Sequence, residues 1–231
     1  WITINGILIQ FYDLFDKFLI KFFLGPVALA TYSVPQQLTG KLSVISKSFS
    51  AFLLPDLSKK KINNNDFEYS LNIFICIIPV LIFLLFPFYS FILKTWLSDS
   101  FNEQILILTK IFSLCAIFAC ASHILVTKFE ATKTLKKNLK IELILMPIFL
   151  ISLIFIISAK YSLITISFLI LTKEYVLFIL RMNFLKNDIK NIKKYYCYSL
   201  FLLLILFLSF FNENLFYLCV VILTIGNLMK N

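Results

Sequence analysis

The sequence has little charge and few of the residues that enzymes use for chemistry. Only 15% of its residues are charged, and it contains one histidine, four glycines and 12 acidic residues. It holds no CxxC pair, nucleotide-binding loop, GxSxG elbow or dinucleotide fingerprint. We therefore expect no metal site, no cofactor and no enzymatic activity. The cysteines lie inside apolar runs and are expected to pack in the core or against lipid: Cys76, Cys115, Cys120, Cys197 and Cys219.

Apolar side chains are more abundant than a soluble domain of this size could bury. Hydrophobic residues make up 60% of the 231 residues, and aromatic residues make up 17%. We expect an all-α, polytopic integral membrane protein. A helical crossing takes about 20 residues, so the length has room for about eight transmembrane helices. The predicted spans are residues 1–22, 28–54, 70–93, 104–127, 139–158, 162–182, 195–211 and 215–229.

The net charge of +10 is distributed in a way that indicates membrane topology. Cytoplasmic loops carry an excess of Lys and Arg, and here the basic residues gather in every second loop. The larger set, predicted to be cytoplasmic, lies within 59–61, 128–140, 181–194 and 230. The smaller set comprises Lys17, Lys21, Lys94 and Lys160. The C-terminus should then be cytoplasmic, and because no single basic face forms, we expect no nucleic-acid partner.

One predicted span carries a wide polar face. Projected at about 100° per residue, residues 33–53 place Gln37, Lys41 and Lys47 on one side, among many hydroxyl side chains. Lipid cannot satisfy such groups, so this face must turn to water or to protein. Lys41 is about 20 Å from either end of the span, which is too deep for its side chain to reach the headgroups easily.

The preceding span also gathers its charges on one side. Asp13, Asp16, Lys17 and Lys21 share a face near the predicted outer rim of the membrane. Asp13 and Lys17 have the i, i+4 spacing of an intrahelical ion pair, which would lower the cost of keeping both charges in the membrane. The alternative is that Lys17 and Lys21 reach the outer headgroups, with Asp13 and Asp16 as counter-ions. The sequence leaves both interpretations open.

Two charged residues and the single histidine lie within later spans. Lys173 and Glu174 are adjacent midway along the sixth span, and adjacent residues of a helix point about 100° apart. We therefore expect that they do not pair with each other. Each would need a partner on another helix, in a structural ion pair or a substrate contact. His123 shares a face with Ala116 and Cys120, which favours close helix packing over a proton relay.

A stretch near the start of the chain has a recognisable pattern. DLFDKFLIKFFLGPVALATYSVPQQL is followed by AFLLPDLSKK. This arrangement resembles the polysaccharide-exporter branch of the multidrug/oligosaccharidyl-lipid/polysaccharide (MOP) flippase superfamily, and in particular the C-terminal part of Wzx-type O-antigen flippases. The positions that match the family pattern are Asp16, Lys17, Gly25, Pro26, Ala28, Tyr32, Pro55, Lys59 and Lys60.

The resemblance implies a fold and a function. Residues 1–182 would form the second, six-helix lobe of a two-lobed transporter with a MATE/MOP-like fold, and the first lobe would precede it. Residues 183–231 would add a cytoplasmic loop and two further transmembrane helices. Such a protein moves an undecaprenyl diphosphate-linked oligosaccharide across the bacterial inner membrane. Membrane lipids and polysaccharide polymerase machinery are its expected partners.

The resemblance also implies the site residues. A cationic cavity would compensate the charge of the diphosphate in a low dielectric, and Lys41 and Lys47 are the preferred contacts. The remaining candidates would line the same cavity, namely Gln37, Asp16 and Lys17, or act in coupling or in a structural ion pair, namely Asp13, Lys173 and Glu174.

Two other classes stay as alternatives. An H+- or Na+-coupled multidrug or organic cation exporter of the same superfamily would share the polar cavity, with Asp13, Asp16 or Glu174 as its coupling carboxylate. A membrane enzyme, such as an O-antigen polymerase or an acyltransferase, would bring a large external loop or a buried catalytic histidine with acidic neighbours. The sequence shows neither feature.

Overall fold

The computed structural model describes residues 2–59, 64–186, 189, 195 and 199, and it leaves out the side chains of residues 2, 4, 5, 9, 12 and 13. Every regular element in these ranges is helical, which confirms the all-α prediction. The α-helices are α1 (Ile2–Leu24), α2 (Pro26–Gly40), α3 (Leu42–Ser58), α4 (Asn64–Leu85), α5 (Tyr89–Leu97), α6 (Glu103–Ala131), α7 (Leu135–Ser158) and α8 (Leu163–Phe184). Two short 3-10 helices, Phe86–Phe88 and Ser98–Ser100, flank α5.

Helix ends fall where the sequence supplies end signals. Gly25 separates α1 from α2 with a φ of 88°, a conformation that glycine adopts without the steric cost of a Cβ atom. Pro26 follows at the first position of α2, where its missing N–H is not needed. At the start of α6, the side chain of Asn102 accepts a hydrogen bond of 3.1 Å from the backbone N–H of Gln104. These signals place reversals that bring successive helices side by side.

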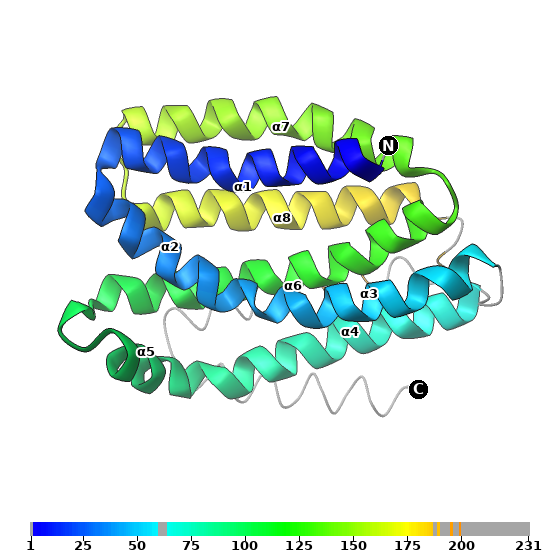
Figure 1. The fold of residues 1–231 in the computed structure, drawn as a ribbon, viewed down its shortest axis with the longest axis horizontal. Coiled ribbons are helices and arrows are strands. Elements are labelled where there is room, and N and C mark those ends of the chain that lie inside the picture. The colour runs from blue at the N-terminus through cyan, green and yellow to red at the C-terminus, as the bar shows by residue number, and fades with distance from the viewer. Residues whose placement is uncertain (1, 60–63, 187–188, 190–194, 196–198, 200–231) are drawn as a thin grey trace.

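The helices run up and down along the long axis of the molecule, with α6 near the middle (Figure 1). α6 packs against α2, α3, α4 and α8, while α7 packs against both α1 and α8. Along α6, the side chains of Leu108, Ile111, Leu125 and Phe129 are fully buried. The core therefore surrounds α6, and the apolar faces of the other helices close around it.

The small-residue face predicted for α6 packs against a neighbouring helix only in part. Ala116 and Cys120 are buried, and the Sγ atom of Cys120 lies 3.7 Å from the backbone oxygen of Leu42 on α3, whereas Ala116, Ala119 and His123 line an internal cavity. Small side chains let two helix backbones approach each other without leaving a gap. This contact fixes the position of the polar residues that α3 carries.

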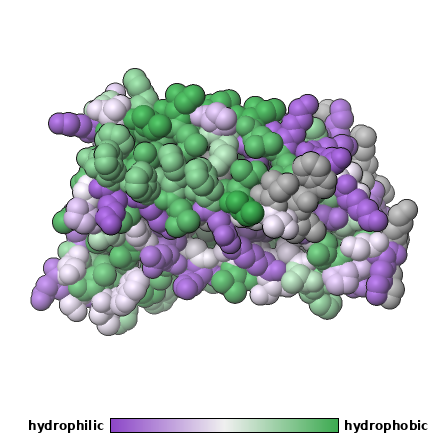
Figure 2. All heavy atoms as spheres, turned by 45° about the horizontal axis from the view of Figure 1, so that its top comes forward, coloured by the Kyte–Doolittle hydropathy of each residue, from purple (hydrophilic) through white to green (hydrophobic). Residues whose placement is uncertain are grey.

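The surface of the bundle is that of a membrane protein. Within the described ranges, four segments are long and apolar enough to cross a membrane: Asn64–Ser100, Glu103–Ala131, Leu135–Ser158 and Leu163–Phe184. Figure 2 shows a broad hydrophobic surface between hydrophilic residues at the two ends of the molecule. Phe22 on α1 and Phe155 on α7 are 72% and 67% exposed. Because water-soluble proteins rarely expose apolar surface on this scale, the chain is a polytopic helical membrane protein.

The predicted count of about eight spans does not hold in the described residues. The predicted span 1–22 is helical but carries several charges, and the predicted span 28–54 is divided at Lys41 into α2 and α3. These two helices have 15 and 17 residues, whereas a crossing needs about 20. The predicted spans 195–211 and 215–229, and most of the region 183–231, lie outside the described residues.

The two ends of the bundle differ in their number of basic residues, which is the quantity that the topology prediction uses. The end of α3, the turn from α6 to α7 and the end of α8 all lie at the right of Figure 1, so Lys59, the basic residues of 128–140 and Arg181 gather at one end. Lys94 and Lys160 lie at the other end, in α5 and in the turn before α8. That the more basic end faces the cytoplasm stays a prediction.

Candidate functional site

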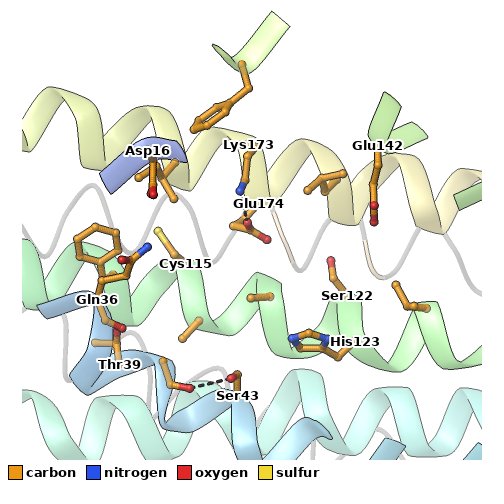
Figure 3. A pocket seen from close by; sticks show the side chains of 18 of the residues that line it. Asp16, Gln36, Thr39, Ser43, Cys115, Ser122, His123, Glu142, Lys173 and Glu174 are labelled. Atoms are coloured by element: carbon orange, nitrogen blue, oxygen red, sulfur yellow. Dashed lines mark hydrogen bonds and ion pairs between the residues drawn. The ribbon is translucent and has the colours of Figure 1, made fainter. Parts of the chain in front are cut away.

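A cavity of about 400 Å³ lies among α1, α2, α3, α6, α7 and α8. Figure 3 shows that polar side chains from several of these helices point into it. Its lining contains four basic and three carboxyl side chains, although the surrounding helices are mainly apolar. The charged lining residues are Asp16, Lys17, Lys47, Glu142, Lys173, Glu174 and Arg181. Because a membrane interior does not tolerate such groups unless they are solvated or paired, the cavity is the candidate functional site.

Asp16 lies at one end of this cavity, held by α2. The Tyr32 hydroxyl donates a hydrogen bond of 2.6 Å to Oδ2 of Asp16, and the backbone N–H of Lys17 donates one of 2.6 Å to Oδ1. Asp16 is only 5% exposed, and the Tyr32 ring packs edge-on against Phe112 of α6. The Asp16 carboxylate therefore lines the cavity and bonds a second helix, and its interpretation as a counter-ion at the membrane rim stays a prediction.

Lys173 and Glu174 lie in the middle of the cavity and pair with each other. The Nζ atom of Lys173 is 3.0 Å from Oε1 of Glu174, and it also lies 5.0 Å from the ring centroid of Phe149 on α7. The prediction that these adjacent residues do not pair was wrong. Their Cβ atoms do point about 100° apart, but the long lysine side chain is flexible enough to cover the difference.

A third polar group closes the other end of the cavity. The Nη2 atom of Arg181 lies 2.6 Å from Oε1 of Glu142, and Nε donates a hydrogen bond of 2.8 Å to Oδ1 of Asn138. Asn138 in turn donates to Oε1 of Glu142 at 3.0 Å. All three side chains are buried, so α7 and α8 are joined here by a fully desolvated cluster.

Sequence reasoning missed this cluster because it assigned Arg181 to a cytoplasmic loop. The available signal was the i, i+4 spacing of Asn138 and Glu142, which puts both on one face of a helix. That spacing does not reveal which helix supplies the basic partner.

Of the three candidate residues in the predicted span 28–54, two line the cavity and one does not. Gln37 on α2 and Lys47 on α3 both line the cavity and are exposed to it. Lys41 is exposed at the junction of α2 and α3 and does not belong to the lining. The side chain of Asp13 lies outside the described part, and the predicted ion pair with Lys17 lies outside it too.

Among the uncharged side chains that line the cavity, two buried polar atoms have unused hydrogen-bonding capacity. Oε1 of Gln36 and Oγ of Ser122 have no hydrogen-bond partner among the described residues. Ser122 is only 2% exposed. Buried polar groups are nearly always satisfied by protein, water or ligand. These two atoms are therefore suited to receive hydrogen bonds from, or donate them to, a polar molecule in the cavity.

The charges of the cavity fall into two groups. Lys173 and Arg181 are neutralised by the carboxylates beside them, whereas Lys17 and Lys47 form no ion pair within the described ranges. His123 also lines the cavity, between these groups. No cluster of three or more His, Cys, Asp or Glu residues that could hold a metal ion occurs in the part of the chain that the structure describes.

Comparison of the chain with protein-family models, with curated proteins and with solved structures found no match. The fold and the cavity therefore define the class: a helical, polytopic membrane protein with a charged cavity inside its bundle.

Proposed function

We propose that the protein is a flippase that moves an undecaprenyl diphosphate-linked oligosaccharide, such as an O-antigen repeat unit, across the bacterial inner membrane. The observation that carries the proposal is the cavity of about 400 Å³, whose lining includes Lys17 and Lys47, neither of which forms an ion pair within the described ranges, in a bundle with membrane-capable helices. Lys47 is exposed and Lys17 is partly exposed, and a charged group within a membrane bundle normally faces a water-filled cavity, a partner or a substrate.

The chemistry of the lining suits both parts of such a headgroup. A diphosphate carries a high negative charge and loses its hydration when it leaves water, and the positive ammonium groups of Lys17 and Lys47 would compensate that loss. Sugar hydroxyls both donate and accept hydrogen bonds, as do the side chains of Gln36, Gln37 and Ser122. The polyprenyl tail would stay in the lipid, against the apolar outer faces of the helices.

The proposal includes the whole-protein arrangement implied by the family resemblance. Residues 1–182 would be the second lobe of a two-lobed MATE/MOP-like transporter, and 183–231 would add two further helices. The basic end of the bundle would face the cytoplasm, together with the C-terminus. Polysaccharide polymerase machinery would receive the flipped substrate. In this arrangement no step is catalytic, and the protein needs no cofactor.

Replacing Lys47 tests the proposal in cells. In a strain without its own lipid-linked oligosaccharide flippase, the whole protein should restore surface polysaccharide, Lys47→Ala should reduce it by about 10-fold or more, and Lys47→Arg should retain most of it. The factor corresponds to losing one charge-assisted contact of about 1.5–3 kcal/mol. Lys94→Ala, at an exposed lysine outside the cavity, is the matched control. Normal polysaccharide with Lys47→Ala, at equal protein level, would count against the flippase.

One observation favours a second candidate, the H+- or Na+-coupled exporter of drugs or organic cations. Asp16 is a buried carboxyl group in the cavity, bonded by Tyr32, which is a suitable position for a coupling residue. Under this proposal, Asp16→Asn should abolish drug resistance in a cell that lacks the sugar-lipid pathway. Under the flippase proposal, the protein confers no resistance in that cell.

A further inference from the structure

We propose that the outer face of α7 binds an anionic phospholipid, with the lipid phosphate on the lysines of its first turns and an acyl chain along its exposed apolar stripe. This site is separate from the cavity and does not depend on which molecule the cavity carries.

The polar half of the site is a group of exposed lysines at the start of α7. Lys136, Lys137 and Lys140 are exposed, and Lys133 adds a further exposed lysine in the turn before the helix. Clusters of four or more basic residues next to a membrane helix attract anionic headgroups, and each contributes roughly a fivefold gain in affinity. The turn lies at the basic end of the bundle (Figure 1).

Basic residues outnumber acidic residues in the segment around this turn. Within residues 128–142 the acidic residues are Glu130 and Glu142. Glu142 is buried and faces inward, where Arg181 neutralises it. Glu130 is half-buried at the end of α6. The segment therefore has a net positive charge, and Lys133, Lys137 and Lys140 expose part of that charge to an approaching headgroup.

The apolar half of the site continues on the same face of the helix. From Lys140, steps of three and four residues lead to Ile144, Ile148, Ile151 and Phe155, which lie one above the other on a helix. Each of these four apolar side chains is more than half exposed. The stripe from residue 144 to residue 155 is about 16 Å long, which is about half of the hydrocarbon core of a bilayer.

The length and charge of this face together select the occupant. A soluble anion would use the lysines but not the stripe, and a neutral lipid would use the stripe but not the lysines. A glycerophospholipid with a net negative headgroup uses both, because it carries a phosphate and an acyl chain in one molecule, and Lys140 and Ile144 are one helical turn apart on the same face.

The experiment compares two lipids on the full-length protein purified in detergent. Dioleoylphosphatidylglycerol should raise the thermal unfolding midpoint, and native mass spectrometry should show it retained in preference to dioleoylphosphatidylcholine. Lys137→Gln combined with Lys140→Gln should lower affinity for the anionic lipid by about 25-fold, while the Arg double variant should keep it. The matched control is Lys94→Gln combined with Lys160→Gln, which removes two exposed lysines at the opposite end.

If the glutamine variant folds poorly, two measurements on the unmodified protein still test the proposal. With the unmodified protein, raising the salt concentration should weaken the preference for the anionic lipid, because the exposed lysines are screened. Glycerol phosphate, which lacks acyl chains, should not shift the midpoint. The proposal is overturned if the glutamine variant keeps the wild-type preference, if the control variant loses it equally, if salt has no effect or if glycerol phosphate stabilises the protein as well as the lipid does.

Discussion

The hydroxyl of Tyr32 donates a 2.6 Å hydrogen bond to the carboxylate of Asp16, sixteen positions earlier in the sequence. Both side chains are buried, and together they join α1 to α2 at one end of the cavity. A buried carboxylate needs such a donor, since loss of a hydrogen bond leaves the group with its full desolvation cost.

Replacing Tyr32 with Phe should destabilise the protein while leaving its packing volume almost unchanged. We expect a loss of about 1–3 kcal/mol in the free energy of unfolding, because the Asp16 carboxylate then lacks its inter-helix donor. Thermal unfolding in detergent measures the effect. Tyr161→Phe, at a tyrosine that is 53% exposed, is the matched control and should be neutral. Equal midpoints for the wild type and Tyr32→Phe would contradict this role of Tyr32.

The buried cluster of Arg181, Glu142 and Asn138 should respond asymmetrically to mutation. Arg181→Met alone should cost about 3–5 kcal/mol, because it leaves the Glu142 carboxylate buried without its ion-pair partner. Combining Arg181→Met with Glu142→Leu should recover much of that loss, since no buried charge then remains. A double-mutant cycle on the unfolding free energies measures the coupling. Additive effects of the two substitutions would show that the ion pair does not join α7 to α8.

Breaking the pair of Lys173 and Glu174 should change the charge that the cavity presents. Glu174→Gln keeps the side-chain volume but removes the carboxylate beside Lys173, which makes the cavity lining one charge more positive. Affinity for a lipid diphosphate should then rise by about fivefold, the effect of roughly 1 kcal/mol. Fluorescence binding titrations in detergent measure it, with Glu103→Gln at the start of α6 as a control outside the cavity. A decrease in affinity would indicate that Glu174 itself contacts the substrate.

The position of the membrane can be tested with the tryptophan of α5. Trp96 is 56% exposed near one end of the bundle, where aromatic side chains sit at the membrane interface. In a Trp1→Phe background, its fluorescence should be quenched more by lipids brominated near the headgroup than by lipids brominated near the chain ends. Ile148→Trp, introduced midway along α7 with both native tryptophans replaced, should show the reverse order. Equal quenching at both positions would contradict the membrane placement of the bundle.

The sequence predicted the helices well because their signals are local. The apolar runs from which the helices were predicted each lie within a single segment of the chain. Four predicted spans were recovered as membrane-capable segments for the same reason. The sequence analysis did not predict that α2 ends at Gly40 and α3 begins at Leu42. The polar residues keep their helical spacing across Lys41, so periodicity alone does not indicate the boundary.

The site was predicted only in part because its partners come from distant segments. Lys47, Gln37, Asp16 and Lys17 were expected to line a cavity, and the structure brings them together in its lining. The contacts of Arg181 with Glu142, 39 positions away, depend on how α7 and α8 pack, and helical periodicity carries no information about that.

The transport account rests on Lys17 and Lys47 of the cavity lining as contacts for the anionic headgroup. Its most direct test is binding of a fluorescent undecaprenyl diphosphate-linked sugar to the purified full-length protein, compared with the Lys17→Ala/Lys47→Ala variant. The account predicts saturable binding that weakens by about 100-fold in the double variant, two charge-assisted contacts being lost. Binding of equal affinity in both proteins, with the variant folded, would contradict it.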